Sequence, residues 1–158
     1  MPLGYDKNGQ LVTGFYKQKT NDIIACNECL IQNEESNAVI QRVKELFVEY
    51  NIKPYDKVTH RGNIKHILTK KGYHSEEFML CFITYQKTIK HIDQIVEILI
   101  QEFPHIKTII QNINERHDNV ILGDEEKILY GKGYIYDTLL DNQYKISLNH
   151  SIKSILFK

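Results

Sequence analysis

The sequence predicts an α+β fold in which two helices pack on one face of an antiparallel or mixed sheet, in a split βαβ-like arrangement. Two segments repeat apolar residues every three or four positions, as amphipathic helices do. Strand-like segments lie before, between and after them, so the middle of the chain reads β, α, β, β, α, β. One of these strands, residues 78–83, is apolar on both faces and is therefore expected in the centre of the sheet.

The first elements are two short strands and a helix. An Asn8-Gly9 turn precedes a predicted strand at residues 11–16, and a second short strand is predicted at residues 22–26. Ser36 is the expected N-cap of the helix, with Glu34 and Glu35 on the side that the helix dipole favours. Lys53-Pro54 ends the helix, and its apolar face consists of Val39, Ile40, Val43, Leu46, Phe47 and Tyr50.

The second half alternates strands with one more helix. Two strands, 64–70 and 77–85, are joined by a turn at residues 72–75. A second amphipathic helix follows and stops at Pro104; its apolar face consists of Ile92, Ile95, Val96, Leu99, Ile100 and Phe103. Further strands are expected at 108–113 and, as short pieces, around 120–122, 127–130 and 144–146.

Composition excludes several classes of protein. With 158 residues, 42% of them hydrophobic, the chain is expected to form one domain with its own core. It has no apolar stretch long enough for a membrane span, no signal-peptide layout and an odd number of cysteines, which together favour a soluble, cytoplasmic protein. The twenty basic and twenty acidic residues balance, so net charge alone does not indicate a nucleic-acid partner.

Two cysteines form a C-x-x-C pair. Cys26 and Cys29 have the spacing of half a zinc site or of a redox pair. A structural zinc site needs four ligands, and the sequence contains no second pair of this kind. Cys81 lies in an apolar strand and is interpreted as a core residue.

Two polar segments are candidates for contacts with phosphate or bases. The first contains Arg61, Lys65 and His66 around Gly62. These side chains either contact phosphates or are ordinary surface residues. A loop after the strand 108–113 carries amides next to Arg116 and His117; these amides either read base edges or shape a turn, and they are Asn112, Asn114 and Asn119. No nucleotide-binding glycine motif and no catalytic arrangement is present.

A series of short motifs, in order along the chain, carries a family resemblance. They are Gly14-Phe15-Tyr16-Lys17, Asn21-Asp22-Ile23-Ile24, Cys29-Leu30-Ile31-Gln32, Tyr55-Asp56, Gly62-Asn63-Ile64-Lys65-His66-Ile67, Gln111-Asn112-Ile113-Asn114, Asn119-Val120-Ile121-Leu122-Gly123, Tyr134-Ile135-Tyr136-Asp137 and Lys145-Ile146-Ser147. In this order the chain resembles the central region of bacterial RNA uracil-5-methyltransferases of the 23S ribosomal RNA type.

The resemblance implies a fragment of an enzyme that methylates C5 of a uridine in ribosomal RNA with S-adenosylmethionine. Many members hold an iron–sulfur cluster (4Fe-4S), and Cys29 matches its fourth ligand by position. The three upstream cysteines are absent, as are the catalytic residues, so the chain is expected to bind neither cofactor, to hold no metal and to be inactive alone. Its expected phosphate contacts are Lys17, Lys19, Arg61 and Lys65.

The resemblance stops near the C-terminus. Residues 1–146 are interpreted as the central domain, and residues 147–158 as a divergent, frameshifted tail. Permitted codons for Ser147 to Leu156, read in another frame, encode Pro-Gln-Ser-Phe-Tyr-Gln-Ile-Asn-Pro, a run of the kind the family requires there. The tail exposes apolar residues that favour self-association, namely Ile152, Ile155, Leu156 and Phe157.

Two alternatives to the methyltransferase fragment remain. One is a stand-alone module that binds RNA or a protein. The other is a small thiol or zinc protein that uses Cys26 and Cys29.

Overall fold

The computed structural model describes residues 1–26, 33–149 and 153–155. Its centre is a four-stranded sheet with the order β4 (Ile64–Lys71), β5 (Phe78–Thr84), β6 (Ile106–Ile113) and β7 (Glu125–Tyr130). The pair β5 and β6 is parallel, and the other two pairs are antiparallel. The α+β fold with a mixed sheet is therefore confirmed.

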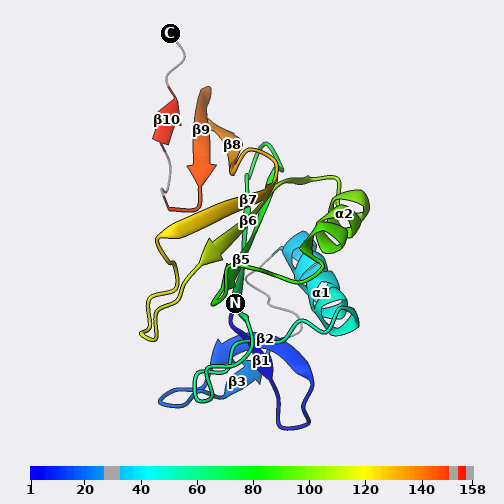
Figure 1. Cartoon of the computed structure of the whole chain (residues 1–158). Helices are drawn as coiled ribbons and strands as arrows, with labels where there is room; N and C mark the ends of the chain where they lie inside the picture. Colours follow the sequence, from blue (N-terminus) through cyan, green and yellow to red (C-terminus); the bar gives the residue numbers. More distant parts are fainter. Residues whose placement is uncertain (27–32, 150–152, 156–158) are drawn as a thin grey trace.

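Both helices cover one face of this sheet (Figure 1). They are α1 (Glu34–Glu49) and α2 (Ile92–Glu102), and their apolar faces form one core with alternate residues of β5. Phe47 of α1 meets Phe82 of β5 with ring centroids 5.5 Å apart. Every residue of β5 is buried, as its unbroken apolar sequence predicts.

A second small core fills the opposite face of the sheet. Met79, Cys81 and Ile83, the other alternate residues of β5, pack there with Ile135 of β8 and Leu148. The strands β8 (Tyr134–Leu139), β9 (Asn142–Ser147) and β10 (Lys153–Ile155) form a three-stranded sheet. Cys81 is a core residue, as the sequence indicates, and burial raises the pKa of its thiol to about 12.

The N-terminal strands form a sheet of their own. It consists of β1 (Leu3–Tyr5), β2 (Leu11–Tyr16) and β3 (Ile23–Ala25). Both edges of β2 are occupied, since it pairs with β1 on one side and β3 on the other, so the predicted strand 11–16 does not enter the main sheet. A bridge between Pro2 and His66 of β4 joins the two sheets.

Three local predictions were wrong or incomplete. The helix begins at Glu34 because Asn33, not Ser36, is the N-cap: the Asn33 side chain accepts a hydrogen bond from the Ser36 N–H at 2.7 Å. Residues 120–122 form no strand, since the Asn114 amide engages the carbonyls of Val120 and Ile121 at 2.7 and 2.8 Å. The strands β1, β8 and β10 were not predicted.

No helix in the described ranges is long and apolar enough to cross a membrane. The segment interpreted as a frameshifted tail contributes Ser147 to β9 and the backbone of β10, which pairs antiparallel with β9. The side chains expected to drive self-association, those of Ile152, Ile155, Leu156 and Phe157, lie outside the described part.

Candidate nucleic-acid interface

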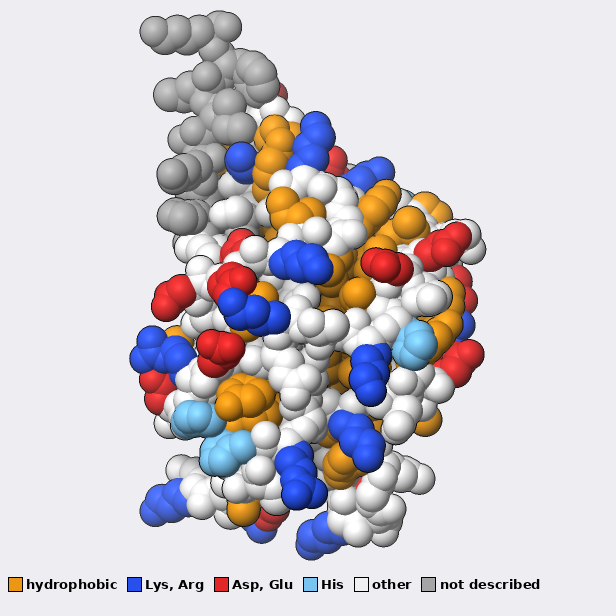
Figure 2. Space-filling model, in the orientation of Figure 1, with side chains coloured by type: hydrophobic (Ala, Val, Ile, Leu, Met, Phe, Trp, Pro, Cys, Tyr) orange, Lys and Arg blue, Asp and Glu red, His pale blue; other side chains and the backbone are white. Residues whose placement is uncertain are grey.

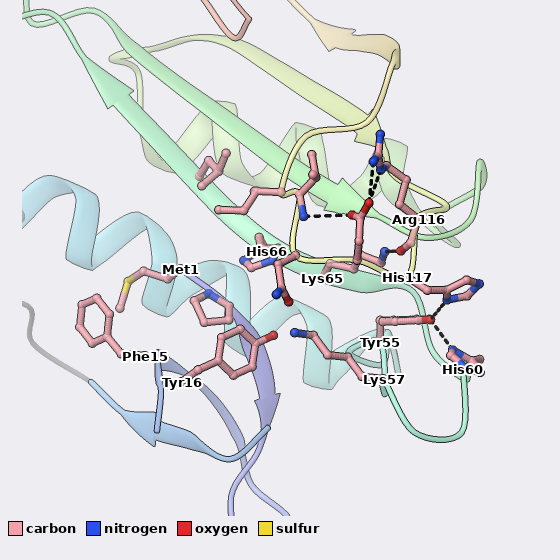
Figure 3. Close-up of a pocket in the computed structure, with 16 residues that line it drawn as sticks. Met1, Phe15, Tyr16, Tyr55, Lys57, His60, Lys65, His66, Arg116 and His117 are labelled. Atoms are coloured by element: carbon pink, nitrogen blue, oxygen red, sulfur yellow. Dashed lines mark hydrogen bonds and ion pairs between the residues drawn. The ribbon is translucent and has the colours of Figure 1, made fainter. Parts of the chain in front are cut away.

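A cavity of about 560 Å³ lies between the N-terminal sheet and the end of the main sheet. Four segments line it: Met1 and Pro2, the end of β2, the loop before β4 together with β4 itself, and the loop between β6 and β7. Figure 2 shows exposed hydrophobic side chains on the lower part of the molecule with His, Lys and Arg side chains near them, and acidic side chains among these. Figure 3 shows the lining residues, with Phe15 and Tyr16 on one side and His66, Lys65 and His117 on the other.

The loop before β4 is held in shape by its own backbone and by Asp56. The Asp56 carboxylate accepts hydrogen bonds from the N–H groups of Val58 and Thr59 at 2.7 and 3.2 Å, which lower the pKa of that carboxyl group. Gly62 has a φ of +86°, and a Cβ built there would lie 1.9 Å from the Pro54 carbonyl oxygen. Because of this tight loop, residues 55–60 sit beside the first residues of β4.

Two buried amides shape the loop between β6 and β7. The Asn112 side chain donates to the Gly123 carbonyl at 3.1 Å and accepts from the Gly123 N–H at 2.7 Å. Asn114 accepts from the Arg116 N–H at 3.0 Å in addition to its two carbonyl contacts. Of the two interpretations of these amides, the structure supports the shaping of a turn for Asn112 and Asn114, since their polar atoms are engaged by the protein. Asn119 lines the cavity.

Tyr55 ties the two loops together. Its hydroxyl lies 2.6 Å from Nδ1 of His60 and 3.1 Å from Nδ1 of His117. Its ring stacks on Tyr85 with centroids 4.7 Å apart. Burial raises the pKa of the Tyr55 hydroxyl, so the group remains a neutral donor and acceptor at this position.

The cavity carries positive charge on lysines. The Lys57 ammonium lies 4.2 Å from the centroid of the Tyr16 ring, and the Lys65 ammonium lies 4.8 Å from that of Tyr55. Lys65 also donates to the backbone carbonyl of Arg116 at 2.6 Å. Neither lysine forms an ion pair with a carboxylate of the described residues, whereas Arg116 is paired with Asp118. Burial first, and repulsion from Lys57 second, lower the pKa of Lys65.

His66 contributes a neutral imidazole to the cavity wall. Burial is the main cause that lowers its pKa to about 4, and the Met1 amino group, Lys57 and Lys65 add repulsion. His66 is therefore uncharged near neutral pH.

The structure brings only some of the predicted phosphate contacts together. Lys65 lines the cavity, and Arg61 lines a second cavity of about 380 Å³. The two cavities meet at shared lining residues, Tyr16, Tyr55 and Lys57. Lys17 and Lys19 are exposed on the turn between β2 and β3 and line neither cavity.

Lys57 and the aromatic side chains are site residues that the sequence motifs did not indicate. Tyr16 is followed directly by Lys17, and Tyr55 lies two positions before Lys57. Alternation of aromatic and basic residues is a usual signal of nucleic-acid surfaces, and these two short runs contain it. What the runs do not indicate is that Tyr16 and Lys57 meet across the cavity.

The described cysteines do not form a metal site. Cys81 is buried in the core, Cys26 is half-buried next to β3, and Cys29 lies outside the described residues. Within the described ranges no group of three or more His, Cys, Asp and Glu could hold a metal ion. These residues therefore do not by themselves fit an iron–sulfur cluster or a zinc ion.

Comparisons with known proteins found relatives in sequence and a solved structure with a similar fold. No model of a known protein family matches the chain. Its curated relatives are proteins named RNA methyltransferases. A protein named as an uncharacterized RNA methyltransferase of Halalkalibacterium halodurans is 40% identical over 147 residues, and one of Staphylococcus epidermidis is 42% identical over 147 residues. Each match covers 93% of this chain and 32% of the relative, so the chain spans about a third of their length.

A solved structure shares the fold. It is the Pyrococcus abyssi tRNA (uracil-54, C5)-methyltransferase in complex with S-adenosyl-L-homocysteine, which superposes with a TM-score of 0.72 at 22% identity. The match covers 98% of this chain and 35% of that enzyme. The arrangement of the two helices, the mixed sheet and the flanking small sheets is thus one that occurs inside a larger methyltransferase.

Proposed function

We propose that this chain is the RNA-binding central part of an S-adenosylmethionine-dependent RNA uracil-5-methyltransferase. The observation that carries the proposal is the cavity in which Lys57 and Lys65 lie beside tyrosine rings, with no carboxylate of the described residues within ion-pair distance of either ammonium group. Ammonium groups neutralise phosphates, and exposed aromatic rings stack on bases, so this combination suits RNA. The relatives named RNA methyltransferases and the fold of a uracil-C5 methyltransferase support the reaction class.

Within this proposal the chain positions RNA and supplies no reacting group. We assign it no catalytic residue, and we place methyl transfer and S-adenosylmethionine in a part of the enzyme outside this sequence. The substrate we propose is 23S ribosomal RNA, with residues 1–146 as the central domain, residues 147–158 as a frameshifted tail and a cytoplasmic location. A role for Cys29 as one ligand of an iron–sulfur cluster belongs to the same proposal and needs three further thiolates from outside this chain.

The test is binding of the purified chain to a single-stranded RNA, measured by fluorescence anisotropy at several salt concentrations. We expect Lys57→Ala combined with Lys65→Ala to weaken binding and to reduce the slope of log K against log[salt] by about 0.7 for each phosphate that no longer meets a lysine. Lys107→Ala combined with Lys132→Ala is the matched control, since both lysines are exposed and line neither cavity. Equal effects of the two double variants would contradict the proposal, because binding would then depend on net charge alone.

The same cavity also supports the alternative that the chain is a stand-alone RNA-binding module. It is distinguished by sequence context: RNA binding by the chain together with flanking reading frames that are unrelated to methyltransferases would favour it. The thiol or zinc protein is not favoured by any described contact.

A further inference from the structure

The larger cavity exposes apolar side chains on both of its walls. One wall carries the rings of Phe15 and Tyr16 at the end of β2, which are 50% and 37% exposed. Val120 and Ile121, 48% and 45% exposed, line the cavity from the loop between β6 and β7. Apolar surface that remains exposed on both sides of a hollow is covered at low cost by a flat, apolar group.

The polar groups concentrate at one side of these apolar surfaces. Lys57 extends toward the Tyr16 ring, and Lys65 enters from β4 (Figure 3). The Lys65 ammonium donates one of its three N–H groups to the Arg116 carbonyl, so two remain that can donate to a ligand. Burial first and Lys57 second lower the pKa of Lys65, while Asp118 acts in the opposite direction, so a phosphate beside both ammonium groups would stabilise their charge.

The size of the cavity limits the ligand. About 560 Å³ lies within the range of pockets that enclose one ligand of small-molecule size. A base stacked inside a double helix presents only its edges, so its face cannot meet Tyr16. An unstacked base of a single strand presents its face to an aromatic ring and a phosphate nearby.

We propose that the cavity is a subsite for one unstacked nucleotide of single-stranded RNA, with its base against the Tyr16 ring and its phosphate on Lys57 and Lys65. This inference rests on the proposed RNA-binding function and adds the state of the RNA and the residue that stacks. Lys57, which lies over the Tyr16 ring in the free protein, moves toward the phosphate when the base covers the ring.

The test uses the absence of tryptophan from this sequence. Tyr16→Trp places a single tryptophan, excited selectively above the absorption of tyrosine, at the subsite, and Tyr73→Trp places one on the exposed turn before β5, which lines neither cavity. We expect titration with a single-stranded oligouridine to quench the tryptophan at position 16 and not that at position 73. An oligouridine whose bases are replaced by abasic sites, and the same sequence in a duplex, are expected to leave both signals unchanged.

Affinity gives a second measurement. We expect Tyr16→Leu to weaken binding of the single strand at least about fivefold, Tyr16→Phe to retain it, and Tyr73→Leu to have no effect. Circular dichroism of each variant verifies that it is folded. If Tyr16→Leu binds like the wild type while the Lys57 and Lys65 variant does not, the subsite is wrong and RNA binding by the chain stands.

Three further outcomes would also overturn the subsite. If no variant alters binding, or the chain binds no RNA, the proposed function fails with it. If free uridine monophosphate quenches the tryptophan at position 16 at concentrations where the oligouridine does not, the cavity takes a free nucleotide and not a nucleotide of RNA.

Discussion

The hydroxyl of Tyr55 lies 3.1 Å from Nδ1 of His117, and these residues are 62 positions apart in the sequence. The same hydroxyl lies 2.6 Å from Nδ1 of His60, and the two imidazole rings meet edge to face at 4.5 Å. One phenol oxygen thus joins the loop before β4 to the loop between β6 and β7. This contact links the two loops that line the cavity.

Tyr55→Phe removes the hydroxyl and keeps the ring that stacks on Tyr85. We expect it to lower the free energy of unfolding by about 0.5–1.5 kcal/mol, because the bond to His117 between the loops and the bond to His60 within one loop are exchanged for bonds to water. Urea unfolding measures the change. An unaltered midpoint, together with unaltered hydrogen exchange in residues 114–120, would show that the contact does not hold the loops.

The stability of the protein depends on pH through His66. Its folded-state pKa of about 4 lies below the ordinary 6.5, so the unfolded chain binds more protons between these two pH values. The contribution is fully present above about pH 6.5 and is lost as the pH falls toward 4, at up to about 1.4 kcal/mol per pH unit.

The variant His66→Gln lacks this titration. We expect its free energy of unfolding, measured in urea between pH 7 and pH 4.5, to fall less steeply than that of the wild type. The difference between the two curves isolates His66 from the carboxyl groups that titrate in the same range. Parallel curves would mean that His66 is solvated and titrates normally.

Asn112 is fully buried, and its amide makes both of its hydrogen bonds to the backbone of Gly123. Asn112→Ala leaves that N–H and that carbonyl without their partner. We expect a loss of about 1–3 kcal/mol in the free energy of unfolding. Asn119→Ala, at an exposed position of the loop that follows β6, is the control and should lose less than about 0.5 kcal/mol.

Cys81 should not react with thiol reagents in the folded protein. Its side chain is 1% exposed, and its pKa of about 12 leaves almost no thiolate at neutral pH. In a Cys26→Ser and Cys29→Ser background, we expect a chromogenic disulfide reagent to modify Cys81 only after unfolding in guanidinium chloride. Rapid modification of the native protein would show that the second core opens to solvent.

Much of the fold could be predicted because residues that face the core recur at regular intervals along each helix and strand. The apolar faces of α1 and α2 and the unbroken apolar run of β5 each predict one partner surface, and the structure pairs these surfaces in a single core. The short strands were harder to predict from the sequence. The segment 120–122 has the composition of a strand, yet the Asn114 side chain donates hydrogen bonds to two of its carbonyls. A local sequence pattern does not predict such a contact. The cap at Asn33 was missed because Ser36, three residues on, has equal cap propensity.

The sequence by itself determined the α+β class, the two helix faces, the central strand and the core position of Cys81, because these depend on which residues avoid water. Tertiary structure decided the site. Tyr16, Lys57, Lys65 and His117 belong to three segments far apart in the chain, and their meeting depends on how the N-terminal sheet docks on β4 and how two loops fold. It also separated Lys65, which faces the cavity, from Lys17 and Lys19, which face solvent on a turn. The sequence gives the type and charge of each residue, whereas the packing of distant segments determines which side chains face the same cavity.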